Sequence, residues 1–304
     1  MYKFDKILVA LDNSQMDEQL IESARFISDL SESGEVHFVN IVKDFDTPAA
    51  LLDQLPNIIT EALKDRKQEI MARVQKVFDT EDPTVHVHVI KGLVLRGILN
   101  YSNENDIDLI IVGRKRDKKA GGILNTRLAR RASCSLMIMP EDAPLRVKNI
   151  LVPLDFSEYS NLAMELALRI AKKKDAKVIA QNVYQIPVGY HYSGKTKAEF
   201  AQIMEQHAAR SFEMLTKTMD LKGINLEKLY TQSADEHLME DVYKTALKTN
   251  ADSIIVGVKG RTATTALFIG SKAEKLIKMD EKIPLVVVRP KGRNAGIIEY
   301  LQEL

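Results

Sequence analysis

A glycine-rich segment in the last quarter of the chain has residue types that can bind an anion. Its glycines and serine follow the spacing Gly257-x2-Gly260-x9-Gly270-Ser271, and an apolar helical pattern follows Ser271. Glycine allows a close approach of the backbone to a ligand, and the backbone amides at the start of a helix attract negative charge. Lys259 and Lys272 would add positive charge. The segment is therefore a candidate phosphate-binding loop.

The same residues also fit a purely structural role. Ser271 and Glu274 have the spacing of a helix capping box, and Gly257 and Gly260 can shape the turn that follows a strand. The segment is not a Walker A loop, because no Gly-Lys-Ser/Thr ends it, and it is not the compact dinucleotide fingerprint. Spacing alone leaves phosphate binding and structural punctuation as alternatives of roughly equal weight.

One carboxylate, Asp155, belongs to the same chemistry if the fold brings it to the glycines. It follows the apolar run 150–154, and Gly257 follows the apolar run 253–256. In an open parallel sheet, ligands bind beyond the carboxyl ends of the strands, where the strand order reverses. If these two strands are neighbours, Asp155 and Gly257 face one crevice. The structural alternative for Asp155 is a carboxylate in a turn or a helix cap.

The elements that position these residues occur twice in the chain. Residues 7–12 return as 150–155, and residues 108–113 return as 252–257, each with five of six positions identical, at offsets of 143 and 144. We interpret the chain as a tandem duplication. Its first domain covers residues 1–145 and its second covers residues 146–304.

Within each copy, short β-branched runs alternate with helical patterns. The predicted strands are 6–11, 35–42, 84–90, 108–112 and 135–139, then 149–154, 177–183, 226–231, 253–256 and 284–288. The predicted helices are 16–31, 57–78 and 94–104, then 159–173, 195–220, 236–249 and 271–279. This alternation requires a parallel sheet with crossover helices. The sequence predicts two tandem, doubly wound, five-stranded α/β domains of Rossmann-like type.

The composition excludes several classes of protein. Of 304 residues, 43 are Lys or Arg and 42 are Asp or Glu, a net charge of +1 that argues against an electrostatic nucleic-acid binder. The single cysteine, Cys134, excludes an internal disulfide framework and is interpreted as a buried, inert thiol. No apolar run suits a signal peptide or a membrane span. We expect a cytoplasmic protein with no membrane partner.

These residues resemble the universal stress protein family along essentially the whole chain. The segment 149–157 looks like the first strand of that family with its acidic turn. The glycine segment matches the family's ATP-binding pattern, Gly-x2-Gly-x9-Gly-Ser/Thr, at every defined position. The resemblance implies that the second domain binds ATP or a related adenine nucleotide. It also implies a nucleotide-dependent regulator of the stress response.

The resemblance also implies a role for each site residue. Asp155 would lie near the ribose and phosphates and is the candidate ligand of a Mg²⁺ ion shared with phosphate oxygens. Pro153 and Leu154 would line the adenine side, and Val183 would offer backbone groups to the base. The residues expected to hold the phosphates are Gly257, Gly260, Gly270 and Ser271, with Lys259 and Lys272 as weaker candidates.

The first copy departs from this pattern. Asp12 and Gly113 are present, but Arg116 stands where the second glycine is expected. The position of the Gly-Ser pair holds Thr126-Arg127, or Asn125-Thr126 after a one-residue deletion. A long side chain at Arg116 opposes close backbone approach. We therefore predict weak or absent ATP binding in the first domain.

Other functions stay open as alternatives. Phosphoryl transfer needs a positioned base, and spacing identifies no catalytic residue, so we expect no enzyme or at most a slow ATPase; a scaffold that binds no nucleotide is the third reading. Family members often pair through the fifth strand, which implies intramolecular domain pairing or a homodimer. His86 and His88 share a strand face, with no Cys or carboxylate at metal-ligand spacing, and are interpreted as a half-exposed strand surface.

Overall fold

The computed structural model describes residues 3–43, 57–116, 119–233, 237–259, 269–279 and 282–290, with the side chains of 119–121 excepted. The chain divides into two compact units. The first unit covers Lys3–Leu145 and the second begins at Arg146.

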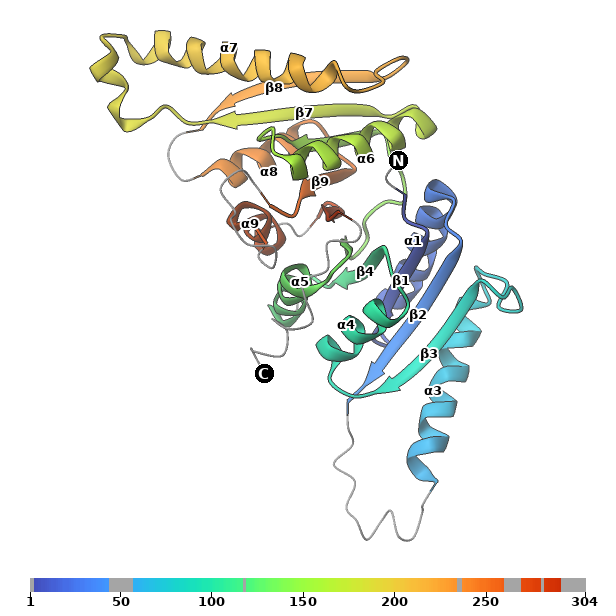
Figure 1. Cartoon of the computed structure of the whole chain (residues 1–304). Coiled ribbons are helices and arrows are strands. Elements are labelled where there is room, and N and C mark those ends of the chain that lie inside the picture. Colours follow the sequence, from blue (N-terminus) through green and yellow to red (C-terminus); the bar gives the residue numbers. More distant parts are fainter. Residues whose placement is uncertain are drawn as a thin grey trace. The chain divides into compact units, whose positions relative to one another are not determined.

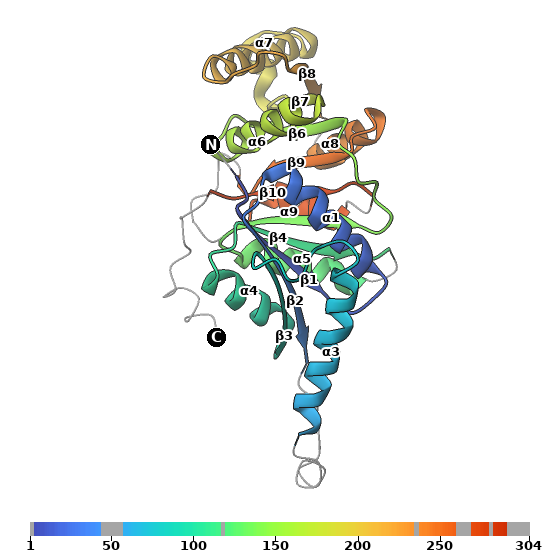
Figure 2. The ribbon, with the colours of Figure 1, turned by 90° about the vertical axis from the view of Figure 1, so that its right-hand side faces the viewer.

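The first unit is a parallel sheet covered by helices (Figure 1). Its strands are β1 (Lys6–Leu11), β2 (Glu35–Val42), β3 (Val85–Lys91), β4 (Leu109–Arg114) and β5 (Ser135–Pro140). Its described helices are α1 (Met16–Ser31), α3 (Ile58–Val74), α4 (Val94–Glu104) and α5 (Lys119–Arg131). The strand order is β3-β2-β1-β4-β5, and all neighbours are parallel. Figure 2 shows α1 and α3 on one side of this sheet and α4 on the other.

The second unit repeats the arrangement. Its strands are β6 (Asn149–Pro153), β7 (Lys177–Tyr184), β8 (Asn225–Gln232), β9 (Ser253–Gly257) and β10 (Leu285–Val288). Its described helices are α6 (Glu158–Lys174), η1 (Val188–Ser193, a 3₁₀ helix), α7 (Lys197–Thr216), α8 (Leu238–Lys248) and α9 (Ser271–Met279). The order is β8-β7-β6-β9-β10, again parallel throughout. The strand order reverses between β6 and β9, which is where an open α/β sheet binds ligands.

Apolar strands explain why the sheets form the cores of the two units. Residues 7–9 in β1 and their counterparts 150–152 in β6 are 0% exposed. Continuous apolar runs of this kind suit strands that are covered by helices on both faces. The predicted doubly wound α/β fold is confirmed.

The duplication extends to individual hydrogen bonds. In the first unit a carboxylate oxygen of Asp108, just before β4, accepts the backbone amides of residues 5 and 6 at 2.8 and 2.9 Å. In the second unit a carboxylate oxygen of Asp252 accepts the amides of residues 148 and 149 at 2.8 and 3.0 Å. The repeated aspartates therefore hold the start of the first strand of each unit against its switch-point neighbour.

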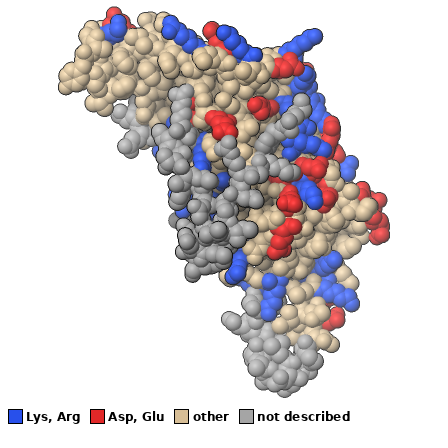
Figure 3. Space-filling view, viewed as in Figure 1, with Lys and Arg blue, Asp and Glu red and all other residues tan. Residues whose placement is uncertain are grey.

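The structure also contains elements that the sequence pattern missed. α5 precedes β5 although its glycines, Gly121 and Gly122, weaken the helical pattern. η1 precedes α7 and exposes Val188 and Tyr192, at 92% and 88% of their surface. Figure 3 shows few charged side chains at this end of the second unit on the face in view. Within the described ranges, no helix combines the length and hydropathy of a membrane span.

Candidate functional site

A cavity of about 570 Å³ opens at the carboxyl ends of β6, β7 and β9 in the second unit. Strand ends form its floor, and side chains from α7, α8 and α9 complete its walls. This volume is in the range of sites that bind a small organic ligand. The cavity lies at the reversal of strand order, where the topology predicts a ligand.

The cavity collects nearly all of the residues that the sequence singles out. The predicted site residues on its wall are Pro153, Leu154, Asp155, Val183, Gly257, Lys259, Gly270, Ser271 and Lys272. The remaining one, Gly260, lies outside the described residues. Asp155 and Gly257 share the cavity because β6 and β9 are neighbours in the sheet.

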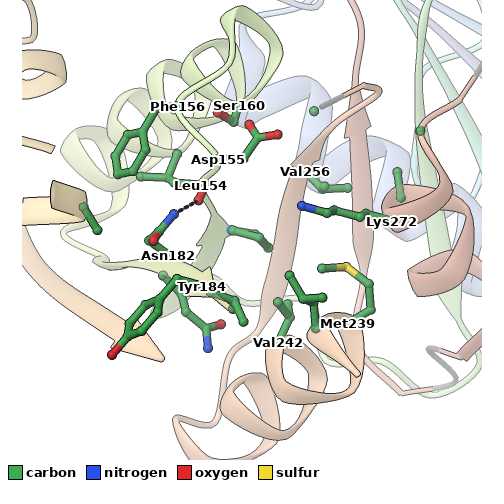
Figure 4. A pocket seen from close by; sticks show the side chains of 18 of the residues that line it. Leu154, Asp155, Phe156, Ser160, Asn182, Tyr184, Met239, Val242, Val256 and Lys272 are labelled. Atoms are coloured by element: carbon green, nitrogen blue, oxygen red, sulfur yellow. Dashed lines mark hydrogen bonds between the residues drawn. The ribbon is translucent and has the colours of Figure 1, made fainter. Parts of the chain in front are cut away.

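Part of the cavity wall is apolar. This part includes Leu154, Val256, Met239 and Val242, whose side chains surround the space in Figure 4. Gln181 also lines it and is fully buried. Such a surface suits a flat, largely apolar ring system with a few polar edges.

The Gln181 amide has an unused acceptor. Its Nε2 donates to the hydroxyl oxygens of Thr231 and Thr245 at 3.0 and 2.9 Å. Its Oε1 is buried and has no hydrogen-bond partner among the described residues. A buried acceptor without a donor costs about 1–3 kcal/mol. Because Oε1 has almost no accessible surface, a ligand in the cavity cannot contact it.

The cavity wall also includes a helix N-terminus and two lysines. The Glu274 amide donates to the Gly270 carbonyl at 3.0 Å, so α9 begins at Ser271 and its first amides have no acceptor within the helix. In Figure 4 Lys272 extends from α9 toward the side of the cavity where Asp155 lies. Lys259 is buried, with its Nζ 5.8 Å from the centre of the Tyr159 ring. These groups can neutralise an anionic group.

Asp155 also has a local structural role. Its Oδ1 accepts the Ser157 amide at 3.1 Å, which closes the turn between β6 and α6. Ser157 in turn caps α6 by accepting the Ser160 amide at 3.3 Å. Phe156, between them, has φ of 60°, an uncommon value for a bulky residue. The turn thus holds the Asp155 carboxylate at the cavity wall.

Gly257 is needed for packing. A Cβ at Gly257 would lie 2.5 Å from the carbonyl carbon of Tyr159 and 2.6 Å from its oxygen. Since these are backbone atoms at the start of α6, they cannot yield as a side chain would. Gly257 therefore permits the close approach of α6 to β9, a structural role different from the turn that the spacing suggested.

The corresponding region of the first unit is built differently. Asp12, the counterpart of Asp155, forms an ion pair with Lys115, the counterpart of Lys259. α5 already begins at Lys119, so residues 125–127 lie inside a helix where the second unit has a helix N-terminus. The exposed Arg116 pairs with Asp142 at 3.4 Å. These features support the prediction of weak or absent nucleotide binding in this unit.

Several wall residues were not predicted from the sequence. Gln181, Asn182 and Tyr184 surround the predicted Val183 on β7, and Met239 comes from α8. The Asn182 side chain donates to the Leu154 carbonyl at 2.7 Å (Figure 4), and Asn40 donates to the Leu11 carbonyl at 2.8 Å in the first unit. The polar pair Gln181-Asn182 near the end of the apolar strand β7 was a sequence signal for cavity residues. Met239 of α8 gave no such signal, because the side of a helix that faces a cavity depends on how the helix packs.

A second group of polar side chains lies on the sheet of the first unit. Glu35 and His37 of β2 lie beside His86 of β3, because the strand register places His37 opposite His86. His86 and His88 are partly exposed, as the sequence predicts. The nearby carboxylate, Glu35, comes from the neighbouring strand and not from residues close to His86 along the chain.

The sequence profile of the universal stress protein family matches residues 3–140 and 146–289. The chain belongs to this family. The two matches confirm the tandem arrangement of universal stress protein domains.

Relatives and known structures agree with this assignment. Universal stress protein MJ0531 of Methanocaldococcus jannaschii is 29% identical over 146 residues, which cover 47% of this chain and 84% of the relative. Universal stress protein MJ0577 of the same organism is 25% identical over 157 residues, which cover 47% of this chain and 95% of the relative. A universal stress protein structure from Archaeoglobus fulgidus aligns over 96% of this chain and 98% of its own, with a TM-score of 0.62 and 16% identity. The last likeness shows the fold alone.

Proposed function

We propose that the second unit of this universal stress protein binds ATP or a related adenine nucleotide, and that occupancy regulates its contacts with a partner during stress in the cytoplasm. The observation that carries the proposal is the cavity at the β6–β9 switch point. It combines apolar wall residues with a helix N-terminus and two lysines, and nine residues of the predicted set line it.

The apolar part of the wall fits an adenine ring. Leu154, Val256 and Met239 offer apolar surface to the faces of the base.

The helix N-terminus and the two lysines fit the phosphates. The first residues of α9 line the cavity, so the backbone amides at this helix N-terminus can bind phosphate oxygens. Lys272 and Lys259 supply positive charge. Asp155 offers the hard oxygen that Mg²⁺ prefers. A bound Mg²⁺ ion would neutralise phosphate charge beside this carboxylate. Gly270, directly before α9, also lines the cavity.

Regulation requires a ligand that binds one conformation better than another. α9, which would hold the phosphates, is joined to α8 by an ion pair between Lys275 and Glu240 at 2.9 Å. Lys275 holds the pKa of Glu240 at about 2, so this pair persists at neutral pH. A nucleotide that fixes the start of α9 would therefore also bias α8. We propose that this helix pair transmits occupancy to a partner.

Isothermal titration of the full chain tests the binding proposal. ATP and adenosine are titrated into wild type, into Lys272→Gln, and into Lys244→Gln as a control at an exposed lysine of α8. We expect Lys272→Gln to weaken ATP at least about 5-fold and adenosine little, because the ammonium faces phosphate. Lys244→Gln should leave both unchanged. No heat with ATP in wild type, or equal weakening of adenosine and ATP in Lys272→Gln, would refute the proposed site.

A second measurement distinguishes a slow ATPase from a regulator that binds ATP without hydrolysing it. Inorganic phosphate release is followed with wild type and Asp155→Asn in the presence of Mg²⁺. Binding without sustained phosphate release supports a regulator. Steady release that Asp155→Asn abolishes would establish hydrolysis in its place.

A further inference from the structure

Three potential metal-ligating atoms converge on the sheet of the first unit. Oε2 of Glu35 lies 3.1 Å from Nε2 of His37 and 3.5 Å from Nε2 of His86. All three ligand atoms lie within 4.8 Å of one another. The two imidazole rings are stacked, with their centres 4.5 Å apart and 27° between their planes, so one ring must turn about its side-chain torsions before both nitrogens point at a single ion. We refer to these residues as the Glu-His-His cluster.

The arrangement follows from strand geometry. Residues two apart on a strand share a face, which puts Glu35 and His37 on the same side of β2. The parallel register sets His37 opposite His86, and neighbouring strands are about 4.8 Å apart. The cluster is therefore built on two regular strands, and rigid elements hold metal ligands more accurately than loops do.

We propose that the Glu-His-His cluster binds one divalent transition-metal ion, with Zn²⁺ as the preferred ion. Zinc bonds of about 2.0–2.1 Å in a tetrahedron separate neighbouring ligands by about 3.3 Å. The two distances from the Glu35 oxygen lie on either side of that value. Two imidazoles and one carboxylate form a donor set found at zinc sites that keep a position open for water.

The neighbouring groups prepare the ligands for a cation. Nδ1 of His37 lies 2.9 Å from the hydroxyl oxygen of Tyr101, and this contact is buried. When Nε2 binds a metal, the Nδ1–H group can donate a hydrogen bond to that oxygen. The Lys6 ammonium lies 3.1 Å from Oε1 of Glu35. Oε2 then faces the imidazoles.

The cluster can be reached from solvent. The His37 side chain is 4% exposed, whereas those of Glu35 and His86 are 34% and 33% exposed. An ion could thus enter past Glu35 and His86 and retain a water molecule. The Lys6 ammonium beside the carboxylate would reduce affinity through charge repulsion. We therefore expect a dissociation constant in the micromolar range, so that the affinity is lower than that of a closed structural zinc site.

The test is a zinc titration of the full chain after chelator treatment. Zinc binding is measured by calorimetry for wild type, His86→Gln, Glu35→Gln and His88→Gln. His88 is the matched control because it lies on the same face of β3 but outside the cluster. We expect one zinc ion per chain for the cluster, at least about 10-fold weaker binding in His86→Gln and Glu35→Gln, and no change in His88→Gln.

A spectroscopic readout separates metal binding from a change in stability. Co²⁺ is added to each protein, and the visible absorption of a four-coordinate ion is recorded together with the far-UV circular dichroism. Absorption in wild type that is lost in a folded His86→Gln protein supports the cluster. The proposal fails if wild type takes up no metal, if zinc binds equally well to the folded His86→Gln protein, or if His88→Gln loses as much affinity as His86→Gln.

Discussion

Acid should weaken the first unit through His37. The pKa of this ring falls from 6.5 to about 4 because the side chain is buried and His86 lies beside it. The unfolded chain therefore takes up a proton near pH 6.5, whereas the folded chain does so only near pH 4. Stability is fully present above pH 6.5 and falls as the pH drops toward 4.

The magnitude follows from the two pKa values. At pH 5 the unfolded form of His37 is almost entirely protonated and the folded form is mostly neutral. The difference between the two pKa values then lowers the free energy of unfolding by about 2 kcal/mol between pH 7.5 and pH 5. Below pH 4 this decrease approaches about 3 kcal/mol. Either value is a large part of the free energy of unfolding of a typical domain.

Other titratable groups surround this ring, and their contributions to the pH dependence must be separated from that of His37. Glu35 opposes the shift, while Lys6 and His86 add to it. His88, from β3, also has a lowered pKa, caused by burial and by Lys67 of α3 and His86, so it weakens the fold in the same pH range. Burial raises the pKa of Tyr101, on α4, to about 12, so this hydroxyl stays neutral. Only a comparison with a His37 variant isolates the contribution of His37.

The assay is urea unfolding of wild type and His37→Gln at pH 7.5 and pH 5.0 in metal-free buffer. Wild type should lose about 2 kcal/mol more than the variant over this range. His88→Gln serves as the matched control, and it should keep most of the wild-type pH dependence. Equal losses in wild type and His37→Gln would refute the reasoning, because His37 would then titrate alike in the folded and unfolded chains.

Further predictions concern packing, capping and the cavity. Gly257→Ala should destabilise the second unit by about 1–3 kcal/mol in urea unfolding, since its Cβ would meet the Tyr159 backbone. A Cβ at Gly122, in α5, has room, so Gly122→Ala should stabilise the first unit by about 0.5–1 kcal/mol. Thr196→Ala removes the capping box of α7 and should cost about 1 kcal/mol by the same measurement, whereas Thr196→Ser should retain the cap. Asp155→Asn can keep the turn bond to the amide of residue 157, so it should leave stability nearly unchanged while reducing the effect of Mg²⁺ on ATP affinity by calorimetry.

The fold was predictable because its signals are local and repeated. The apolar runs of β1, β4, β6 and β9 and the helical spacing of α1 specify elements whose type allows few alternatives. α1, α4 and α9 begin and end where the pattern predicts. α5 was missed because glycines interrupt its pattern. The duplication supplied a second, independent copy of each signal.

The candidate cavity was predictable only in part. Strand-end residues such as Asp155 and Val183 could be named, since topology brings strand ends together. Met239 could not, because the rotation of α8 about its axis depends on tertiary packing, whereas the polar pair Gln181-Asn182 near the end of β7 was a signal that the prediction did not use. The Glu-His-His cluster escaped for a related reason. Within it, His37 and His86 lie 49 residues apart on two strands, and strand register is not encoded near either one.

The central claim is that one of the two units binds an adenine nucleotide. Its most direct test is the number of ATP molecules bound per full chain, measured by equilibrium dialysis with wild type and with Gly270→Val, which fills the start of α9. We predict one ATP per chain in wild type and none in Gly270→Val. Two ATP molecules per chain, none at all, or one that Gly270→Val retains would contradict the account.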